Sequence, residues 1–143
     1  TEDMIVEQKI IANKELTVTV IENEGEVRSL GVTEIKFDSL IYNYQAKYTK
    51  GYSSHIFPAK IPKKDYNYLL KISEKIFKLI GCKSIARIDY IMNKNISDNR
   101  YFFLEVNTHP GLTDISLVPE QAFFNNLSYS DLIEMILNSA DVK

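Results

Sequence analysis

The stretch from residue 101 to residue 111 constrains the fold more than any other part of this sequence. It reads as a strand that ends at a Pro-Gly turn, and strand side chains point alternately to opposite faces. The alternation predicts two sets on opposite faces: Phe102, Leu104 and Val106 on one, and Phe103, Glu105 and Asn107 on the other. A carboxylate and a carboxamide on an otherwise apolar strand suit the binding of a hard cation that prefers oxygen ligands.

Residues 84–99 supply a partner strand and a connection that is rich in turn-forming residues. An antiparallel hairpin of these two strands places Asp89 opposite Glu105 and Arg87 opposite Asn107. Two carboxylates that face each other destabilise a strand pair, unless a divalent cation lies between them. Two interpretations remain open at this point: a metal site, or the solvated face of an edge hairpin.

The rest of the chain predicts an α+β domain built on a mainly antiparallel sheet. Further strands are predicted at residues 4–11, 15–21, 27–35 and 55–59, with a hairpin turn at 23–26. Residues 41–54 are aromatic and polar, and predict a strand end followed by a loop that is mobile from about 47 to 54. Helices are predicted at 62–80, at 118–125, and from a capping box at Ser128 and Asp131 to about 140. We expect the 62–80 helix to cover one face of the sheet and the terminal helices to pack at its end.

The two longer helices carry apolar residues at helical spacing, which predicts that these residues are buried. The first stripe consists of Tyr66, Leu69, Leu70, Ile72, Ile76, Phe77, Leu79 and Ile80. The second consists of Leu132, Ile133, Met135, Ile136 and Leu137. Gly81 is a natural end for the first helix, and Cys82 is expected to be a small buried residue.

Composition excludes several functional classes. The 143 residues suffice for one domain with a core, and a net charge of −2 offers no basic surface for nucleic acid. No apolar run reaches the length of a membrane span. The single cysteine cannot form an internal disulfide, which fits a reducing compartment. The sequence has no P-loop, no dinucleotide-binding glycine motif, no zinc ligand set and no catalytic triad spacing.

Five separate motifs resemble, in order and spacing, those of D-alanine–D-alanine ligases, which are members of the ATP-grasp superfamily. They are Val-Glu-Gln-Lys-Ile at 6–10 with 15–18, the tyrosine-rich run at 42–48, Arg-Ile-Asp at 87–89, Phe-Leu-Glu-Val-Asn-Thr at 103–108, and Pro-Gly-Leu-Thr at 110–113 with 116–119. The resemblance covers nearly the whole chain and implies the C-terminal subdomain of an ATP-grasp fold. It also implies that the N-terminal substrate domain and the first ATP-grasp subdomain are absent from residues 1–143, so that this chain alone is expected to be inactive.

The resemblance implies roles around the transferred phosphoryl group. Asp89, Glu105 and Asn107 match the ligands of two Mg²⁺ (or Mn²⁺) ions, with Glu105 bridging them. Arg87 matches a catalytic residue near the phosphoryl group and the tetrahedral intermediate, and Gly111 matches a backbone N–H that donates to that oxyanion. Such residues suit phosphoryl transfer, which depends on positioning and on charge neutralisation.

The resemblance also implies two binding regions. The residues that match contacts to ATP are Glu7, Gln8, Lys9, Ile10, Glu15, Ile91 and Leu104. The residues that match the group around the carboxylate of the second D-alanine are Lys47, Ser116 and Leu117. Lys47, Tyr48 and Ser116 are expected among the catalytic residues.

The chain departs from the family pattern at three places. There is one extra residue between Glu7 and Glu15, His109 stands where a serine is usual, and Asp114-Ile115 replaces Ser-His. The expected function of the full-length protein is ATP-dependent synthesis of D-alanyl-D-alanine for peptidoglycan in a bacterial cytoplasm, by a homodimer without nucleic-acid or membrane partners. Two alternatives remain: an ATP-grasp carboxylate–amine ligase with another acceptor, and a non-catalytic module that binds nucleotide or metal.

Overall fold

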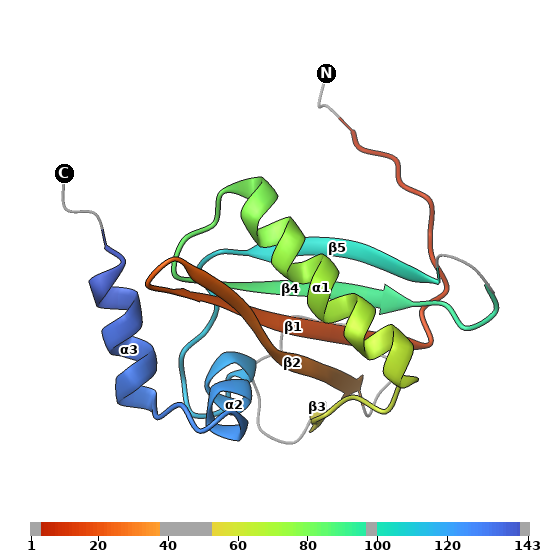
Figure 1. The fold of residues 1–143 in the computed structure, drawn as a ribbon. Helices are drawn as coiled ribbons and strands as arrows, with labels where there is room; N and C mark the ends of the chain where they lie inside the picture. The colour runs from red at the N-terminus through yellow and green to blue at the C-terminus, as the bar shows by residue number, and fades with distance from the viewer. Residues whose placement is uncertain (1–3, 38–52, 97–99, 141–143) are drawn as a thin grey trace.

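Antiparallel strands in the order β3-β2-β1-β4-β5 form the sheet at the centre of the computed structural model (Figure 1), which describes residues 4–37, 53–96 and 100–140. The strands are β1 (Lys14–Asn23), β2 (Glu26–Phe37), β3 (Ser53–Ile56), β4 (Ile85–Met92) and β5 (Tyr101–Asn107). The helices of the described part are α1 (Lys63–Ile80), α2 (Leu117–Phe124) and α3 (Tyr129–Asn138). The α+β class predicted from the sequence is confirmed.

A tight turn joins β1 to β2. Glu24 and Gly25 occupy it with φ values of 51° and 82°, and a two-residue hairpin turn of type I′ needs positive φ at both central positions. Asn23 pairs with Glu26 across the turn, which confirms the hairpin predicted at residues 23–26. Glycine accepts a positive φ without a steric penalty, so Gly25 helps to set the register of the two strands.

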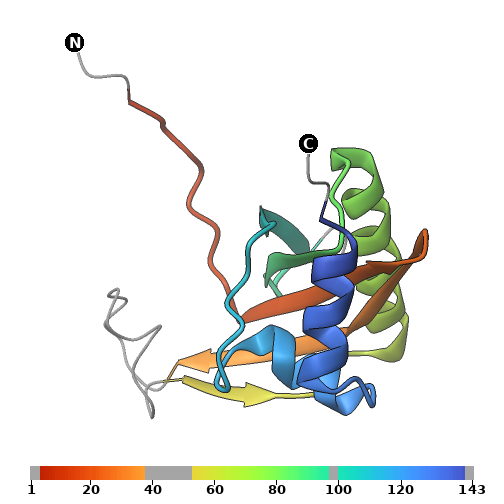
Figure 2. The same cartoon turned by 90° about the vertical axis from the view of Figure 1, so that its left-hand side faces the viewer.

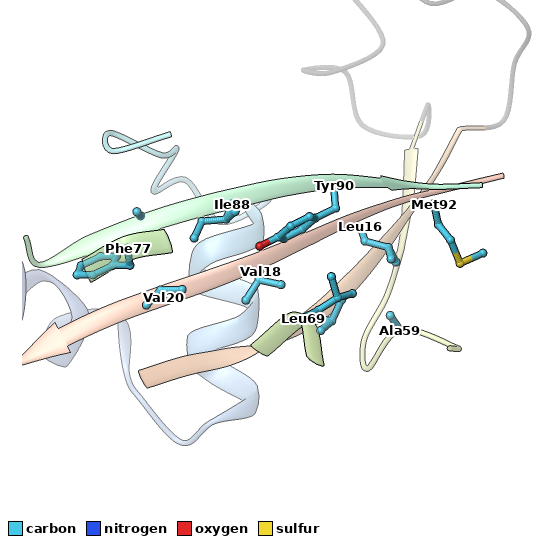
Figure 3. Close-up of a cluster of buried hydrophobic side chains, with 11 residues drawn as sticks. Leu16, Val18, Val20, Ala59, Leu69, Phe77, Ile88, Tyr90 and Met92 are labelled. Carbon is cyan, nitrogen blue, oxygen red and sulfur yellow. The ribbon is translucent and has the colours of Figure 1, made fainter. Parts of the chain in front are cut away.

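The main core lies between α1 and the sheet (Figure 3). Leu16, Val18 and Val20 point from β1 toward Leu69 and Phe77 of α1, and all five are at most 1% exposed. Apolar residues at every second strand position thus meet the apolar stripe of a helix. Full burial of each such side chain stabilises the fold by roughly 1.5–3 kcal/mol.

Three apolar residues that were predicted to be buried lie instead at the surface. Leu79 and Ile80 are 83% and 55% exposed at the end of α1, and Leu137 is 67% exposed in α3. Successive helical residues turn by about 100°, so Leu79 points almost directly away from the sheet when Phe77 faces it. Leu137 lies on the outer side of α3 for the same reason, since Leu132 faces the core.

The end of α1 follows the prediction in one respect and departs from it in another. Gly81 terminates the helix in the left-handed conformation with a φ of 75°. Cys82 is only partly buried at the margin of the main core, and not fully buried as expected. Burial nevertheless raises the pKa of its thiol.

The terminal helices cover one end of the sheet (Figures 1 and 2). The predicted capping box opens α3, because the Asp131 N–H donates to Ser128 Oγ at 3.1 Å and the Ser128 N–H donates to Asp131 Oδ2 at 2.9 Å. The side-chain hydrogen bond with Ser128 lowers the pKa of Asp131. A second core joins these helices to the sheet through Ile21, Leu30, Ile85, Val118, Ala122 and Leu132.

Residues 4–12 do not form the strand that was predicted at 4–11. Met4, Ile5 and Val6 are 88%, 88% and 92% exposed, and the segment leads away from the sheet (Figure 2). A strand needs hydrogen-bonding neighbours, and β1 is already flanked by β2 and β4. The strand propensity of these residues therefore has no ladder to join within the described part of the chain.

A bulge in β5 changes the predicted alternation of its side chains. The pairing shifts so that Glu105 faces Asp89 but Phe103 faces Tyr90. Phe103 thus shares the α1 side with Tyr90, and the two rings meet edge-on with centroids 6.2 Å apart. One extra residue in a strand reverses the alternation beyond it, so Phe103 is not beside Glu105, and Phe102 takes the opposite face.

Candidate functional site

The face of the sheet opposite α1 gathers polar side chains from four strands. Because residues two apart on a strand share a face, the strand register arranges them in rows across the sheet. One row contains Thr33, Thr17, Asp89 and Glu105, and the next contains Gly31, Thr19, Arg87 and Asn107. The pairs of Asp89 with Glu105 and of Arg87 with Asn107 are those predicted from the sequence, so the predicted register is confirmed as far as the bulge.

Arg87 lies between the two carboxylates of this face. Its Nε lies 3.0 Å from Asp89 Oδ1 and its Nη2 lies 2.8 Å from Asp89 Oδ2, a two-pronged contact that the planar guanidinium favours. The same Nη2 lies 3.8 Å from Glu105 Oε1. Asp89 is buried, whereas 61% of the Glu105 side chain is exposed. The cluster is therefore anchored on β4 and open to solvent on β5.

The oxygen atoms around this cluster suit a small divalent cation. Asp89 and Glu105 supply carboxylates, and Asn107 supplies a carboxamide whose Oδ1 accepts the His109 N–H at 3.0 Å. Mg²⁺ is usually held by one or two carboxylates together with substrate phosphates and water. Within residues 4–37, 53–96 and 100–140, no three or more His, Cys, Asp or Glu side chains gather as a metal cage. With two carboxylates and one carboxamide, the cluster fits a cation whose remaining ligands are phosphate oxygens and water.

A more apolar row lies beside the carboxylates, on the side toward β3. Glu15 pairs with Ile91, so two residues that resemble nucleotide contacts lie together on this face. Leu104, a third, is half exposed at the bulge of β5. At the far edge, His55 Nδ1 lies 2.9 Å from Glu120 Oε2 of α2. This contact ties the edge strand to the helix.

The other residues predicted to contact ATP are not brought to this face. Glu7, Gln8 and Lys9 are exposed and Ile10 is partly buried, in a segment without regular structure (Figure 2). The extra residue noted before Glu15 falls in this same segment. The structure does not assemble the predicted adenine-binding strand pair.

Two further predictions fall wholly or partly outside the described residues. Lys47 and Tyr48 both lie there, and so do residues 47–52 of the predicted mobile loop. The last two residues of that loop, Ser53 and Ser54, belong to β3 and pair with β2.

A tight turn connects β5 to α2 and contains the residues that resemble the acceptor loop. Ser116 Oγ accepts the Thr113 N–H at 3.0 Å and lies 2.8 Å from Thr113 Oγ1. A Cβ on Gly111 would come within 2.9 Å of that same Oγ, so glycine permits the close approach. Ser116 is also the N-cap of α2, and Leu117 is the first residue of the helix. Gly111, Ser116 and Leu117 are therefore brought together.

Two buried polar residues behind the cluster were not predicted from the sequence. Thr17 Oγ1 donates to Asp89 Oδ1 at 2.6 Å, and the Gln121 carboxamide of α2 bonds to β1. Thr17 had a detectable signal, because threonines alternate with apolar residues along β1 and so share the face of Asp89. Gln121 had none, since a single glutamine in a short helix usually faces solvent.

Comparison with known proteins gives one consistent result. Residues 1–138 match the family described as D-ala D-ala ligase C-terminus. A D-alanine–D-alanine ligase from Rickettsia bellii is 39% identical over 139 residues, which make up 96% of this chain and 41% of that protein. The chain therefore spans less than half the length of this relative.

Solved structures agree with the sequence match. The structure of a D-alanine–D-alanine ligase from Bacillus anthracis complexed with ATP superposes with a TM-score of 0.68 at 26% identity, and covers 92% of this chain and 41% of that one. The VanG D-Ala:D-Ser ligase from Enterococcus faecalis superposes with a TM-score of 0.72 at 27% identity, and covers 91% of this chain and 37% of that one.

Proposed function

Because this chain belongs to the D-ala D-ala ligase C-terminus family, we propose that it forms the phosphoryl-handling part of an ATP-dependent ligase that joins two D-alanines. ATP phosphorylates the carboxylate of one D-alanine, and the amine of the second then attacks the acylphosphate and releases phosphate. The product, D-alanyl-D-alanine, enters peptidoglycan synthesis. The cluster of Arg87, Asp89 and Glu105 carries this proposal, because phosphoryl transfer relies on positioning and charge neutralisation.

The cluster would do its work through fixed charges. Asp89, Glu105 and Asn107 would hold two Mg²⁺ (or Mn²⁺) ions, which when bound neutralise charge on the phosphates. Arg87 is always charged and would face the transferred phosphoryl group. Its contacts to Asp89 at 2.8 and 3.0 Å set the plane of the guanidinium before a substrate arrives. Such preorganisation removes part of the entropic cost of the reaction.

The turn before α2 would receive the reacting carbonyl and the second D-alanine. The exposed backbone of Gly111 would donate its N–H to the oxyanion of the tetrahedral intermediate. Ser116 and Leu117, with Lys47, would bind the carboxylate of the second D-alanine, and Tyr48 would lie beside Lys47. The support for this assignment is the tight geometry of the turn, which holds Ser116 Oγ against Gly111.

ATP itself would lie across the apolar row of the sheet. Ile91 and Leu104 would contact the adenine, and Glu15 would bind the ribose. The remaining contacts would come from Glu7, Gln8, Lys9 and Ile10. These four require that residues 4–12 lie against the nucleotide, and their exposure leaves them accessible for that contact.

We also propose that residues 1–143 form a single domain, the C-terminal part of an ATP-grasp fold. The share of the relatives that the chain covers supports this assignment. The first D-alanine and part of the ATP would then be bound by segments outside the chain. Residues 1–143 alone are accordingly expected to bind nucleotide weakly and to form no dipeptide.

The surroundings of the protein follow from the same proposal. No helix in the described part of the chain combines the length and apolarity that a membrane span requires. The ligase would work in the bacterial cytoplasm, where ATP is available, as a homodimer without nucleic-acid or membrane partners. Oligomerisation would reside in the N-terminal domain.

A second acceptor is a specific alternative. The match to a D-Ala:D-Ser ligase is as good as the match to the Bacillus anthracis enzyme, by identity and by TM-score. The residues beside Ser116 also depart from the D-alanine–D-alanine pattern, since Asp114 and Ile115 replace Ser-His. D-Serine is therefore the competing acceptor.

A hybrid ligase provides the test. In this hybrid, the present chain replaces the segment of the Rickettsia bellii ligase to which it is 39% identical. ADP release is measured with D-alanine alone and with D-alanine plus D-serine or D-lactate, and the product is identified by mass. D-Alanyl-D-alanine as the main product supports the proposal, and a preferred D-serine product supports the alternative. A folded hybrid that binds ATP but releases no ADP with any acceptor would leave only the non-catalytic module.

A further inference from the structure

Asp89 receives a hydrogen bond that the proposed phosphoryl chemistry does not account for. Its Oδ1 accepts the Thr17 hydroxyl at 2.6 Å, and both groups are buried, at 0% and 7% exposure. Thr17 is a direct cross-strand neighbour of Asp89 in the pairing of β1 with β4. A β-branched side chain in a strand has few χ1 choices, so the hydroxyl is a fixed donor that selects one orientation of the carboxylate.

This donor complements the grip of Arg87. The guanidinium of Arg87, two residues away on the same strand, contacts both Asp89 oxygens, whereas Thr17 of β1 contacts only Oδ1. An ionised carboxylate offers about four lone-pair sites on its two oxygens. A neutral hydroxyl occupies one of them without repelling a cation, and it limits the rotation of the carboxylate toward Arg87.

The strand that carries Thr17 is itself held by α2. The pairing of β1 with β2 is irregular after Thr19, and there the Thr19 N–H donates to Gln121 Oε1 at 3.0 Å. Gln121 Nε2 donates to the Thr33 hydroxyl at 2.8 Å and to the Thr17 carbonyl at 3.3 Å. Gln121 is fully buried, and all its hydrogen-bonding groups are used. It therefore holds the backbone of β1 from the Thr17 carbonyl to the Thr19 N–H, directly after the residue that carries the hydroxyl.

We propose that Thr17 is a positioning residue for the Asp89 carboxylate, and that Gln121 fixes the strand segment from which Thr17 acts. This inference rests on the proposed function, in which Asp89 is a cation ligand. Partners in the outer shell that orient a ligand typically change metal affinity by 10–100-fold when they are removed. Because α2 begins directly after the turn that contains Ser116, Gln121 also links the position of the cation site to that of the acceptor turn.

The chain offers a matched control on the same strand. Thr19 is as buried as Thr17, at 0% exposure, and faces the same side of the sheet. Its hydroxyl has no hydrogen-bond partner among the residues that the structure describes. Thr17→Val and Thr19→Val thus remove the same group from the same environment, and only Thr17→Val removes a bond to Asp89.

The experiment measures Mn²⁺ binding in the presence of AMP-PNP by electron paramagnetic resonance, on the full 143-residue chain and on the hybrid ligase. Thr17→Val is expected to weaken Mn²⁺ binding by about 10-fold, Thr17→Ser to restore it to within about 2-fold, and Thr19→Val to leave it unchanged. Gln121→Leu is expected to weaken it less than Thr17→Val, and to speed hydrogen exchange of the Thr19 amide. Unfolding midpoints identify any variant that fails to fold. A folded Thr17→Ser variant that binds Mn²⁺ about 10-fold more weakly than the wild type would contradict the proposal, because it keeps the hydroxyl.

The outcomes separate this inference from the function on which it rests. If Glu105→Gln abolishes Mn²⁺ binding while Thr17→Val binds like the wild type, Thr17 does not position Asp89 and the proposed cation site stands. Equal weakening by Thr17→Val and Thr19→Val would also overturn the inference, because it would show a packing effect. If neither the wild-type chain nor the wild-type hybrid binds Mn²⁺, both proposals are wrong.

Discussion

The two faces of the sheet differ although they are built from the same strands. On β1, Leu16 and Val18 enter the core under α1, while Thr17 between them faces the polar cluster. The α1 face is closed, and its buried Tyr90 hydroxyl bonds to Ser73 at 2.7 Å. The opposite face stays open at Glu105. Side chains that alternate along a strand therefore have different roles. A residue on the α1 face mainly stabilises the fold, and its neighbour in sequence mainly shapes the site.

The largest effect is expected from a cavity on the closed face. Phe77 is 1% exposed under the sheet, and Phe77→Ala should lower the free energy of unfolding by about 3–5 kcal/mol, because it removes apolar burial and leaves a cavity. Leu79→Ala is the matched control on the same helix, since Leu79 is 83% exposed, and its effect should stay within about 0.5 kcal/mol. Urea unfolding measures both. Similar losses for the two variants would contradict the assignment of the faces.

The next effect is expected on the open face, where a substitution should change turnover and leave stability nearly unchanged. In the hybrid ligase, Glu105→Gln should lower turnover about 100-fold or more, which corresponds to about 2.7 kcal/mol of barrier. Its unfolding midpoint should hardly change, because 61% of the side chain is exposed. Glu26 is an exposed carboxylate at the β1–β2 turn, so Glu26→Gln is the control for the loss of one negative charge. Turnover is followed as ADP release that depends on D-alanine, and an unchanged rate in Glu105→Gln would show that this carboxylate takes no part in the chemistry.

A third effect is expected from the Tyr90 hydroxyl, which is buried on the closed face. Burial raises the pKa of Tyr90 to about 12 from 10.0. Between pH 10 and pH 12 the Tyr90 hydroxyl therefore keeps its proton in the folded protein but loses it in the unfolded chain. The contribution of Tyr90 to the free energy of unfolding is thus fully present below pH 10 and is lost as the pH rises toward 12. The loss should reach about 2 kcal/mol over this window.

Paired variants isolate this contribution of Tyr90. In the double variant Tyr90→Phe with Ser73→Ala, the free energy of unfolding should fall less at alkaline pH, by the contribution of Tyr90. Both partners of the hydrogen bond are replaced so that no buried hydroxyl is left unpaired. Urea unfolding between pH 8 and pH 12 provides the measurement. An identical alkaline slope in the wild type and the double variant would rule out Tyr90 as its source.

The smallest effect concerns α3, which packs against the second core at one end of the sheet. Ser128→Ala removes the capping box and should cost about 1 kcal/mol of stability, without changing turnover of the hybrid. Ser130→Ala, one position before Asp131 and exposed, should be nearly silent. The lowered pKa of Asp131 means that its contribution is present above the acid range and is lost as the pH falls. If the Ser128→Ala hybrid is fully folded and its turnover still falls, the prediction is wrong, and α3 influences the site directly.

Sequence patterns predicted the hairpin best, because there two signals agreed. Alternation in 84–92 and 101–107 and the turn between them fixed the pairs of Asp89 with Glu105 and of Arg87 with Asn107. The bulge before Glu105 could not be predicted, since an extra residue in a strand has no signature beyond the alternation that it disrupts. That is why Phe103 was assigned to the wrong face.

Other errors have a common cause in tertiary context. Leu79 and Leu137 belong to apolar stripes, but which part of a stripe is buried depends on where the helix meets its neighbours. Residues 4–11 have strand propensity without a partner in the described sheet. The roles of Thr17 and Gln121 arise from contacts across 72 and 104 residues of sequence, which no local pattern records.

The bulge in β5 has a consequence for how copies of this protein meet one another. In the described sheet β5 is an edge strand, and a flat apolar edge is a template on which another chain can add a strand and begin to aggregate. Phe103 and Leu104 are each 49% exposed there, which would make such an edge adhesive. The extra residue interrupts the regular spacing of hydrogen-bonding groups at this point, and the neighbouring Glu105 adds a charge that a second copy would have to desolvate. The irregularity next to the carboxylate that faces Asp89 would thus also disfavour the addition of a strand from a second copy.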